Sequence, residues 1–150
     1  MSKLAEASNR FYDRIRRDDA GKAAVGEATA KGFGHLKGSY CLVISYRRSG
    51  DAVPTPLWYG IDDQGRLYFR TYAPSAKVKR IRGDARVRVA PCTMRGKPLG
   101  PAAEGTARIL AGEEEQHAEQ TIHDHYGLFR RVYERTTGNV DAVYVEVVPV

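Results

Sequence analysis

The side chains best suited to binding an anion lie in one basic segment, residues 75 to 88. The segment opens with Ser75, Ala76 and Lys77, and it holds six lysines and arginines against the one carboxylate of Asp84. Serine is a common helix N-cap, so a helix is predicted to begin here. The unpaired amides of a first helical turn, a serine hydroxyl and a lysine ammonium can together hold a phosphate group. By charge alone, the segment would equally fit a solvated basic helix on the surface.

Thr71 extends this pattern into the strand that precedes the segment. Residues 67 to 72 alternate in polarity, as in a strand with two different faces. The odd-numbered residues, Thr71 among them, form one face, and Arg70 lies on the other face with two tyrosines. Thr71, Ser75 and Lys77 therefore follow the pattern T-x-x-x-S-x-K, which runs from a strand end into a helix start.

The middle of the chain consists of strand-forming runs separated by tight turns. Pro54 and Pro56 place one run at a sheet edge or beside a pocket, because proline cannot donate to a sheet ladder. Gly65 suits a turn that needs a positive φ angle. Successive strands joined by tight turns imply an antiparallel sheet or barrel of about six strands. The predicted strands are residues 39–46, 53–59, 67–72, 86–92, 102–110 and 141–148.

Helices are predicted at both ends of the chain. Residues from about 4 to 31 are rich in Ala, Glu, Arg and Lys, and a second helix spans about residues 112 to 136 with a break at Gly127. A chain of 150 residues is long enough for a core of its own. We therefore expect a single domain over residues 1–150, with an N-terminal helical extension over about residues 1–35.

The composition limits the partners and the location. The formal net charge of +6 favours anionic partners such as nucleotides, phosphorylated cofactors or nucleic acid. No apolar run reaches about 18 residues, so no membrane span is expected. The N-terminus lacks the apolar core of a signal peptide, which favours a cytoplasmic location. Cys41 and Cys92 have apolar neighbours and are predicted to be buried free thiols rather than a disulfide.

Other kinds of chemistry have little support in the sequence. His117, His123 and His125 would point in different directions around a helix, and no cysteine or carboxylate pair completes a metal site. We therefore expect no metal. The sequence contains no glycine-rich nucleotide loop and no convincing Ser-His-Asp arrangement, and it identifies no catalytic residue.

Four runs of the chain, taken with the T-x-x-x-S-x-K pattern, resemble a known family. The runs are VPTPLWYG from residue 53, SAKVKRIR from residue 75, VRVAPC from residue 87 and GPAAEGTARIL from residue 100. They resemble the pyridoxamine-phosphate-oxidase-like split barrels, a family of flavin and deazaflavin oxidoreductases, and most closely the branch that uses coenzyme F-420. The resemblance extends over about residues 38 to 110.

The resemblance implies a fold and an assembly. The fold would be mainly β with flanking helices, a split β-barrel of about six antiparallel strands. The assembly would be a homodimer with cofactor pockets between the subunits. The coenzyme ring would lie against residues 53–58, and its phosphate would bind at the start of the basic helix. The implied cofactor contacts are Val53, Thr55, Trp58, Arg70, Thr71, Ser75, Ala76, Lys77 and Arg80.

The implied reaction transfers hydride from reduced coenzyme F-420 to a small conjugated acceptor. FMN or FAD is the alternative cofactor, because the same pattern serves a flavin phosphate equally well. Flavin and deazaflavin rings carry the hydride chemistry themselves, and the protein supplies orientation and charge. A proton could arrive from solvent or from Tyr59, Tyr72 or Tyr126, and the sequence does not rank these tyrosines.

A non-catalytic binder is the competing class of function. Such a protein would sequester a flavin or deazaflavin, or would bind nucleic acid through its basic face. Nucleic-acid binding would need cations spread over a broad face with exposed aromatic side chains between them. Here the cations gather at one helix start, which disfavours nucleic acid and fits a compact phosphate better.

Overall fold

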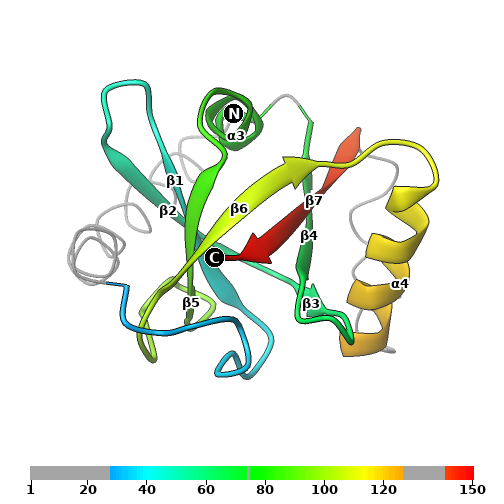
Figure 1. Cartoon of the computed structure of the whole chain (residues 1–150), viewed down its shortest axis with the longest axis horizontal. Helices are drawn as coiled ribbons and strands as arrows, with labels where there is room; N and C mark the ends of the chain where they lie inside the picture. Colours follow the sequence, from blue (N-terminus) through cyan, green and yellow to red (C-terminus); the bar gives the residue numbers. More distant parts are fainter. Residues whose placement is uncertain (1–27, 74, 127–140) are drawn as a thin grey trace, which may run out of the picture.

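The computed structural model describes residues 28–73, 75–126 and 141–150. These residues form a seven-stranded sheet in the order β2-β1-β5-β6-β7-β4-β3, in which every pair of neighbouring strands is antiparallel (Figure 1). The strands are β1 Cys41–Tyr46, β2 Ala52–Leu57, β3 Gly60–Ile61, β4 Leu67–Tyr72, β5 Arg86–Pro91, β6 Ala103–Ile109 and β7 Ala142–Pro149.

The sheet curls around one apolar core. Val43 of β1 lies opposite Val89 of β5, which in turn lies opposite Ala103 of β6, and all three side chains are buried. Leu57, at the end of β2, packs against the same cluster that contains Phe69 of β4. Strands at opposite ends of the sheet order therefore meet on one core, which makes the architecture a split β-barrel.

Two strand edges bound the split. The edge strand β2 pairs only with β1 in the described structure, and β4 beyond Tyr68 pairs only with β7. Val53 and Thr55 lie on the first of these edges, and Thr71 lies on the second. The prediction that the proline-containing run is an edge strand is confirmed.

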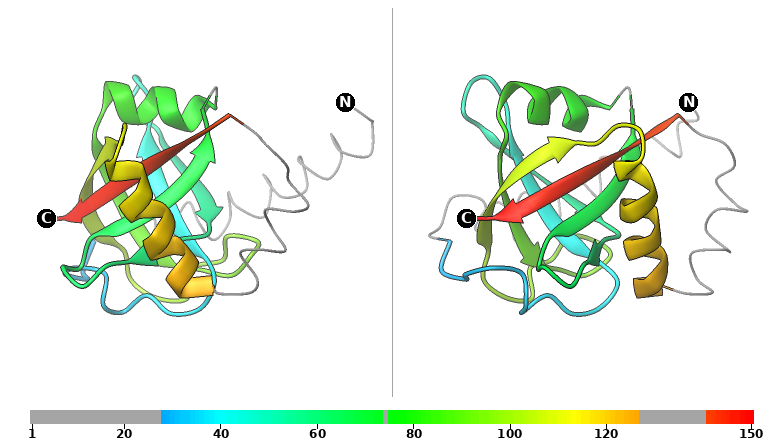
Figure 2. Two further views of the ribbon diagram at one scale, coloured as in Figure 1. Left: turned by 90° about the vertical axis from the view of Figure 1, so that its right-hand side faces the viewer. Right: turned by 45° about the vertical axis from the view of Figure 1, so that its right-hand side comes forward.

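Helix α3 (Ala76–Gly83) joins β4 to β5 across one end of the barrel (Figures 1 and 2). Ser75 is its N-cap, and the Ser75 hydroxyl accepts a hydrogen bond from the Val78 amide. Val78 and Ile81 are buried beneath the helix, and Lys79 and Arg82 lie on its exposed side. The predicted start of this helix at Ser75 is confirmed.

Helix α4 (Glu114–Tyr126) covers the outer face of β3, β4 and β7, as Figure 2 shows. Its Ala118 and Ile122 pack against Tyr68 in a second apolar cluster. At Gly60 the strand comes so close to the helix that an added Cβ would lie 2.5 Å from the Thr121 carbonyl oxygen. Hence α4 fits the sheet only because residue 60 has no side chain.

The six predicted strands all exist, and the structure adds β3, which is too short to give an alternating pattern. Most of the predicted N-terminal helix lies outside the described residues. Its last part is wrong, because residues 28–31 are not helical and Ala30 forms a parallel bridge with Ala103. The predicted second helix is described as far as Tyr126, and the rest lies outside the described residues. No helix in the described part of the chain is long and apolar enough to cross a membrane.

Candidate functional site

The start of α3 brings Lys77 back onto the strand that precedes it. The short turn after β4 is closed by a hydrogen bond from the Ser75 amide to the Tyr72 carbonyl, 3.1 Å long. The ammonium of Lys77 then donates to the hydroxyl of Thr71 over 3.3 Å. Both residues are more than nine-tenths buried, with Lys77 9% and Thr71 8% exposed. A buried ammonium is thus held in place at a helix start.

The donors at this position suit an oxyanion. Ser75 accepts from the Val78 amide through its hydroxyl oxygen, so its hydroxyl hydrogen can still be donated to a ligand. The amides of a first helical turn point the same way and carry the positive end of the helix dipole. An ammonium, two hydroxyls and these amides are the set of groups that phosphate-binding sites use.

A cationic cavity of about 520 Å³ lies on another side of α3, between the helix and the turn that joins β1 to β2. Arg47 and Arg48 of that turn line it, together with Lys79 and Arg80 of the helix. Arg80 is anchored, because its Nε donates to the buried Ser45 hydroxyl over 2.7 Å. Burial, and after it the positive charge of Arg47, lowers the pKa of Arg80. The cavity therefore gathers the positive charges of several side chains, and one of these side chains, Arg80, is partly removed from water.

Sequence reasoning missed Arg47 and Arg48, which it assigns only to a polar hairpin turn. Their proximity to α3 depends on the contact between β1 and the helix, which spans 35 residues from Ser45 to Arg80. The one available signal was two adjacent arginines in a tight turn.

The residues predicted to contact the coenzyme ring, within 53–58, lie in two different places. Val53 lies directly opposite Ser45, and Thr55 lies opposite Val43, so both face the inside of the barrel on the edge strand. Val53 is therefore next to the serine that holds Arg80. Trp58 packs instead against the cluster under α4 and meets the ring of Tyr40 edge-on, with the centroids 6.3 Å apart.

Arg70 lies on the opposite face of β4 from Thr71. In the register of the sheet it faces Tyr144 of β7. Its Nε atom is buried and has no hydrogen-bond partner among the described residues. Of the nine predicted contact residues, Thr71, Ser75 and Lys77 come together, Ala76 and Arg80 line the adjoining cavity, and Arg70 lies apart from both groups.

The candidate proton donors differ in their surroundings. Tyr59 is 1% exposed and donates to the Gly38 carbonyl over 3.1 Å. Burial, followed by the charges of Cys41 and Cys92, raises the pKa of Tyr59 to about 12, which makes it a poor acid near neutral pH. Tyr72 is 53% exposed, and the side chain of Tyr126 lies outside the described residues.

The two cysteines are buried free thiols, as predicted. Burial raises the pKa of Cys41 well above its ordinary value and that of Cys92 to about 12. Neither thiol has the lowered pKa that a reactive cysteine needs.

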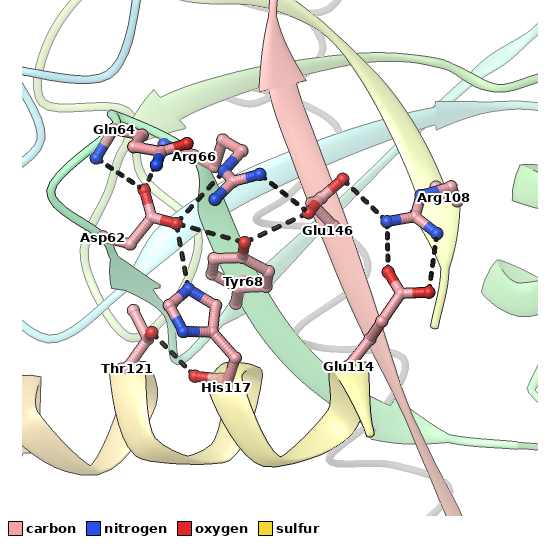
Figure 3. A network of polar contacts seen from close by, with 9 residues as sticks. All are labelled: Asp62, Gln64, Arg66, Tyr68, Arg108, Glu114, His117, Thr121 and Glu146. Atoms are coloured by element: carbon pink, nitrogen blue, oxygen red, sulfur yellow. Dashed lines mark hydrogen bonds and ion pairs between the residues drawn. The ribbon is translucent and has the colours of Figure 1, made fainter. Parts of the chain in front are cut away.

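A polar network joins α4 to the sheet on the far side of β4 from Thr71 (Figure 3). The Tyr68 hydroxyl lies 3.1 Å from both the Asp62 and the Glu146 carboxylates. His117 of α4 contacts the same Asp62 oxygen over 3.0 Å. Burial opposes ionisation of Asp62, but hydrogen bonds from His117, Arg66, Gln64 and Tyr68 outweigh it and lower the pKa of Asp62 to about 2.

His117, one of the three histidines noted in the sequence, is thus a partner of Asp62 in this network. His125 has a different contact, the Gly38 carbonyl at 2.9 Å. Within the described residues no three His, Cys, Asp or Glu side chains are grouped so that they could hold a metal ion.

No protein-family model matches the sequence, and no curated protein matches it either. Solved structures do match. An FAD-binding protein of Mesorhizobium loti is 15% identical with a TM-score of 0.53, over 77% of this chain and 83% of that one. A candidate pyridoxamine 5′-phosphate oxidase of Listeria innocua is 15% identical with a TM-score of 0.50, over 75% and 84% of the two chains.

The heme storage protein HutZ of Vibrio cholerae has a TM-score of 0.58 at 7% identity, over 75% of this chain and 82% of that one. At such identities the likeness concerns the fold alone. It agrees with the sheet topology, since the similar structures are split barrels of the pyridoxamine-phosphate-oxidase-like kind. The fold expected from the sequence is therefore confirmed.

Proposed function

We propose that this protein is an oxidoreductase that binds the deazaflavin coenzyme F-420 and passes hydride from its reduced form to a small conjugated acceptor. The observation that carries the proposal is the buried contact between Lys77 and Thr71 at the start of α3. Because the Lys77 ammonium is already held by Thr71, it need not reorganise when an anion binds, and this favours binding of a phosphate at the start of α3. FAD-binding and heme-storage proteins with the same fold support a planar ring as the rest of the ligand.

The roles of the residues follow from their positions. Thr71, Ser75 and Lys77 would hold the phosphate, and the backbone amide of Ala76 would add to the helix-start charge. Val53 and Thr55, half-buried on the edge of the split, would form one wall for the ring. The bound ring supplies the hydride chemistry, and the chain orients it and limits the access of water. The pocket would be completed by a second subunit of a homodimer.

Titration of the purified protein with coenzyme F-420, FMN and FAD, followed by fluorescence, tests the choice of cofactor. We expect saturable binding of the deazaflavin. Tight binding of FMN with none of the deazaflavin would show that the protein is a flavin-dependent split barrel instead. Sedimentation of the loaded protein would test the dimer, which a monomer at saturating cofactor would contradict.

A second experiment tests the reaction. The reduced cofactor and the protein are mixed with quinones, tetrapyrroles and other conjugated acceptors, and reoxidation is followed by absorbance. Turnover that depends on the protein supports an oxidoreductase. Tight binding without turnover of any acceptor would identify a non-catalytic binder.

A further inference from the structure

Two loops meet at the end of the barrel opposite α3. The first is residues 28–38, before β1, and the second is residues 93–101, which joins β5 to β6. Nε2 of His35 lies 2.9 Å from the carbonyl oxygen of Pro101, so the two loops are side by side. Because β5 runs from α3 to the second loop, the whole barrel separates these loops from the helix (Figures 1 and 2). We call the outward side of the two loops the Met94 surface.

Large apolar side chains are exposed on the Met94 surface. Met94 and Leu99 are each 62% exposed. The backbone of their loop is held by its own hydrogen bonds. The Thr93 amide donates to the Lys97 carbonyl over 2.9 Å, and the Leu99 amide donates to the Pro91 carbonyl over 2.8 Å. Two apolar side chains on one fixed loop would be stabilised by a partner that removes them from water.

The first loop is anchored in the main core. Phe33 and Leu36 are buried there, and the Leu36 amide donates to the Phe33 carbonyl over 3.1 Å. Lys31 and Lys37, on either side of this anchored pair in the sequence, are exposed. The backbone that carries these lysines is thus held before any partner binds, which reduces the entropy lost on binding.

The charge of the Met94 surface has one sign. Residues 28–38 and 93–101 contain no aspartate or glutamate, and they hold four exposed cations, Lys31, Lys37, Arg95 and Lys97. None of the ion pairs among the described residues includes any of the four. The surface therefore keeps its positive charge and suits an anionic partner.

We propose that the Met94 surface docks on the face of a bilayer that contains anionic lipid. Met94 and Leu99 would enter the headgroup layer, and the cations of the two loops would pair with lipid phosphates and carboxylates. The exposed apolar side chains favour lipid over an acidic protein, because solvated carboxylates offer them no apolar layer. The inference is independent of the proposed function, since none of these residues is a predicted cofactor contact.

Co-sedimentation of the full chain with vesicles tests the proposal. One set of vesicles is phosphatidylcholine alone, and the other contains about one third phosphatidylserine. We expect binding to the anionic set only. The apolar variant, Met94→Ser/Leu99→Ser, should weaken this binding by about fivefold or more. The charge variant, Arg95→Gln/Lys97→Gln, should weaken it by about tenfold or more. All four side chains are exposed, so both variants should fold.

Matched controls lie at the other end of the barrel. Lys79→Gln/Arg82→Gln removes two exposed charges from α3, and Tyr72→Ser removes a 53%-exposed side chain just before this helix. Both controls should bind the anionic vesicles within about twofold of the original protein.

Four results would overturn the proposal. The first is that the anionic vesicles do not bind, and the second is that the α3 control weakens binding as much as the charge variant does. The third is that the apolar variant binds as tightly as the original protein, which would indicate attraction by charge alone, as to an acidic protein. The fourth is that the apolar variant turns a dimer into a monomer in sedimentation, because the Met94 surface would then be a contact between two copies of the chain.

Discussion

The ammonium of Lys77 and the hydroxyl of Thr71 lie 3.3 Å apart, although one residue belongs to a helix and the other to the preceding strand. The contact is possible because the turn between them returns the chain onto β4 and Ser75 caps the new helix at once. A lysine directed inward at a helix start is poorly placed for solvent and well placed for a buried anion.

Replacing Lys77 by methionine tests this interpretation. Methionine keeps the apolar stem and removes the ammonium, so we expect cofactor binding to weaken by roughly 1–3 kcal/mol, the loss typical of one charged hydrogen bond. The measurement is a fluorescence titration with coenzyme F-420. Lys97→Met, at an exposed lysine of the turn after β5, is the matched control and should bind normally. Unchanged affinity in Lys77→Met would mean that the cofactor phosphate binds at another position.

Gly60 offers a test of how α4 docks on the sheet. A Cβ at this position would lie 2.5 Å from the carbonyl oxygen of Thr121 and 2.9 Å from the Cα of Ile122, both backbone atoms that cannot turn away. We expect Gly60→Ala to lower the free energy of unfolding by roughly 1–3 kcal/mol, as overpacking does. Urea denaturation measures the effect.

The control for this substitution is Gly34→Ala. Gly34 has an ordinary backbone conformation, and a Cβ there would meet no atom within 4 Å. Its stability should therefore stay close to that of the original protein. If both variants lose stability equally, close approach of α4 at residue 60 is not the cause.

Sequence patterns were sufficient to predict contacts between residues that lie close together along the chain. Alternation in β4 and a serine followed by basic residues define the Thr71–Lys77 pair, which spans only six positions. Sequence patterns were insufficient to predict contacts that depend on how distant elements pack. The alternation placed Arg70 on the face opposite Thr71, but it gave no sign that Trp58 packs into the cluster under α4, the helix that covers the outer face of the sheet. No pattern along the chain indicates which face a distant helix will cover.

Tyr68 joins carboxylates that are far apart in the sequence. Its hydroxyl contacts Asp62 and Glu146, and the second of these contacts spans 78 residues. Tyr68→Phe removes the hydroxyl from a 1%-exposed side chain and leaves both acids with one partner fewer. We expect the free energy of unfolding to fall by roughly 1–3 kcal/mol. Tyr72→Phe, at a 53%-exposed tyrosine of the same strand, should have little effect in the same thermal or urea measurement.

The pH dependence of stability tests the role of Asp62. Its pKa is lowered from 3.8 to about 2 by hydrogen bonds that include those from His117 and Tyr68, and these prevail over the opposing effect of burial. A lowered pKa in the folded state means that ionised Asp62 contributes stability above about pH 4 and that this contribution is lost as the pH falls toward 2.

Urea denaturation at several pH values between 6 and about 2 measures this loss. Asp62→Asn should be less stable than the original protein at pH 6, and the difference between the two should shrink as the pH falls through the window from about 4 to about 2. Asp63→Asn, at the exposed neighbour in the same turn, should follow the original protein throughout. A stability difference that stays constant over this window would mean that the carboxylate charge of Asp62 does not stabilise the contact between α4 and the sheet.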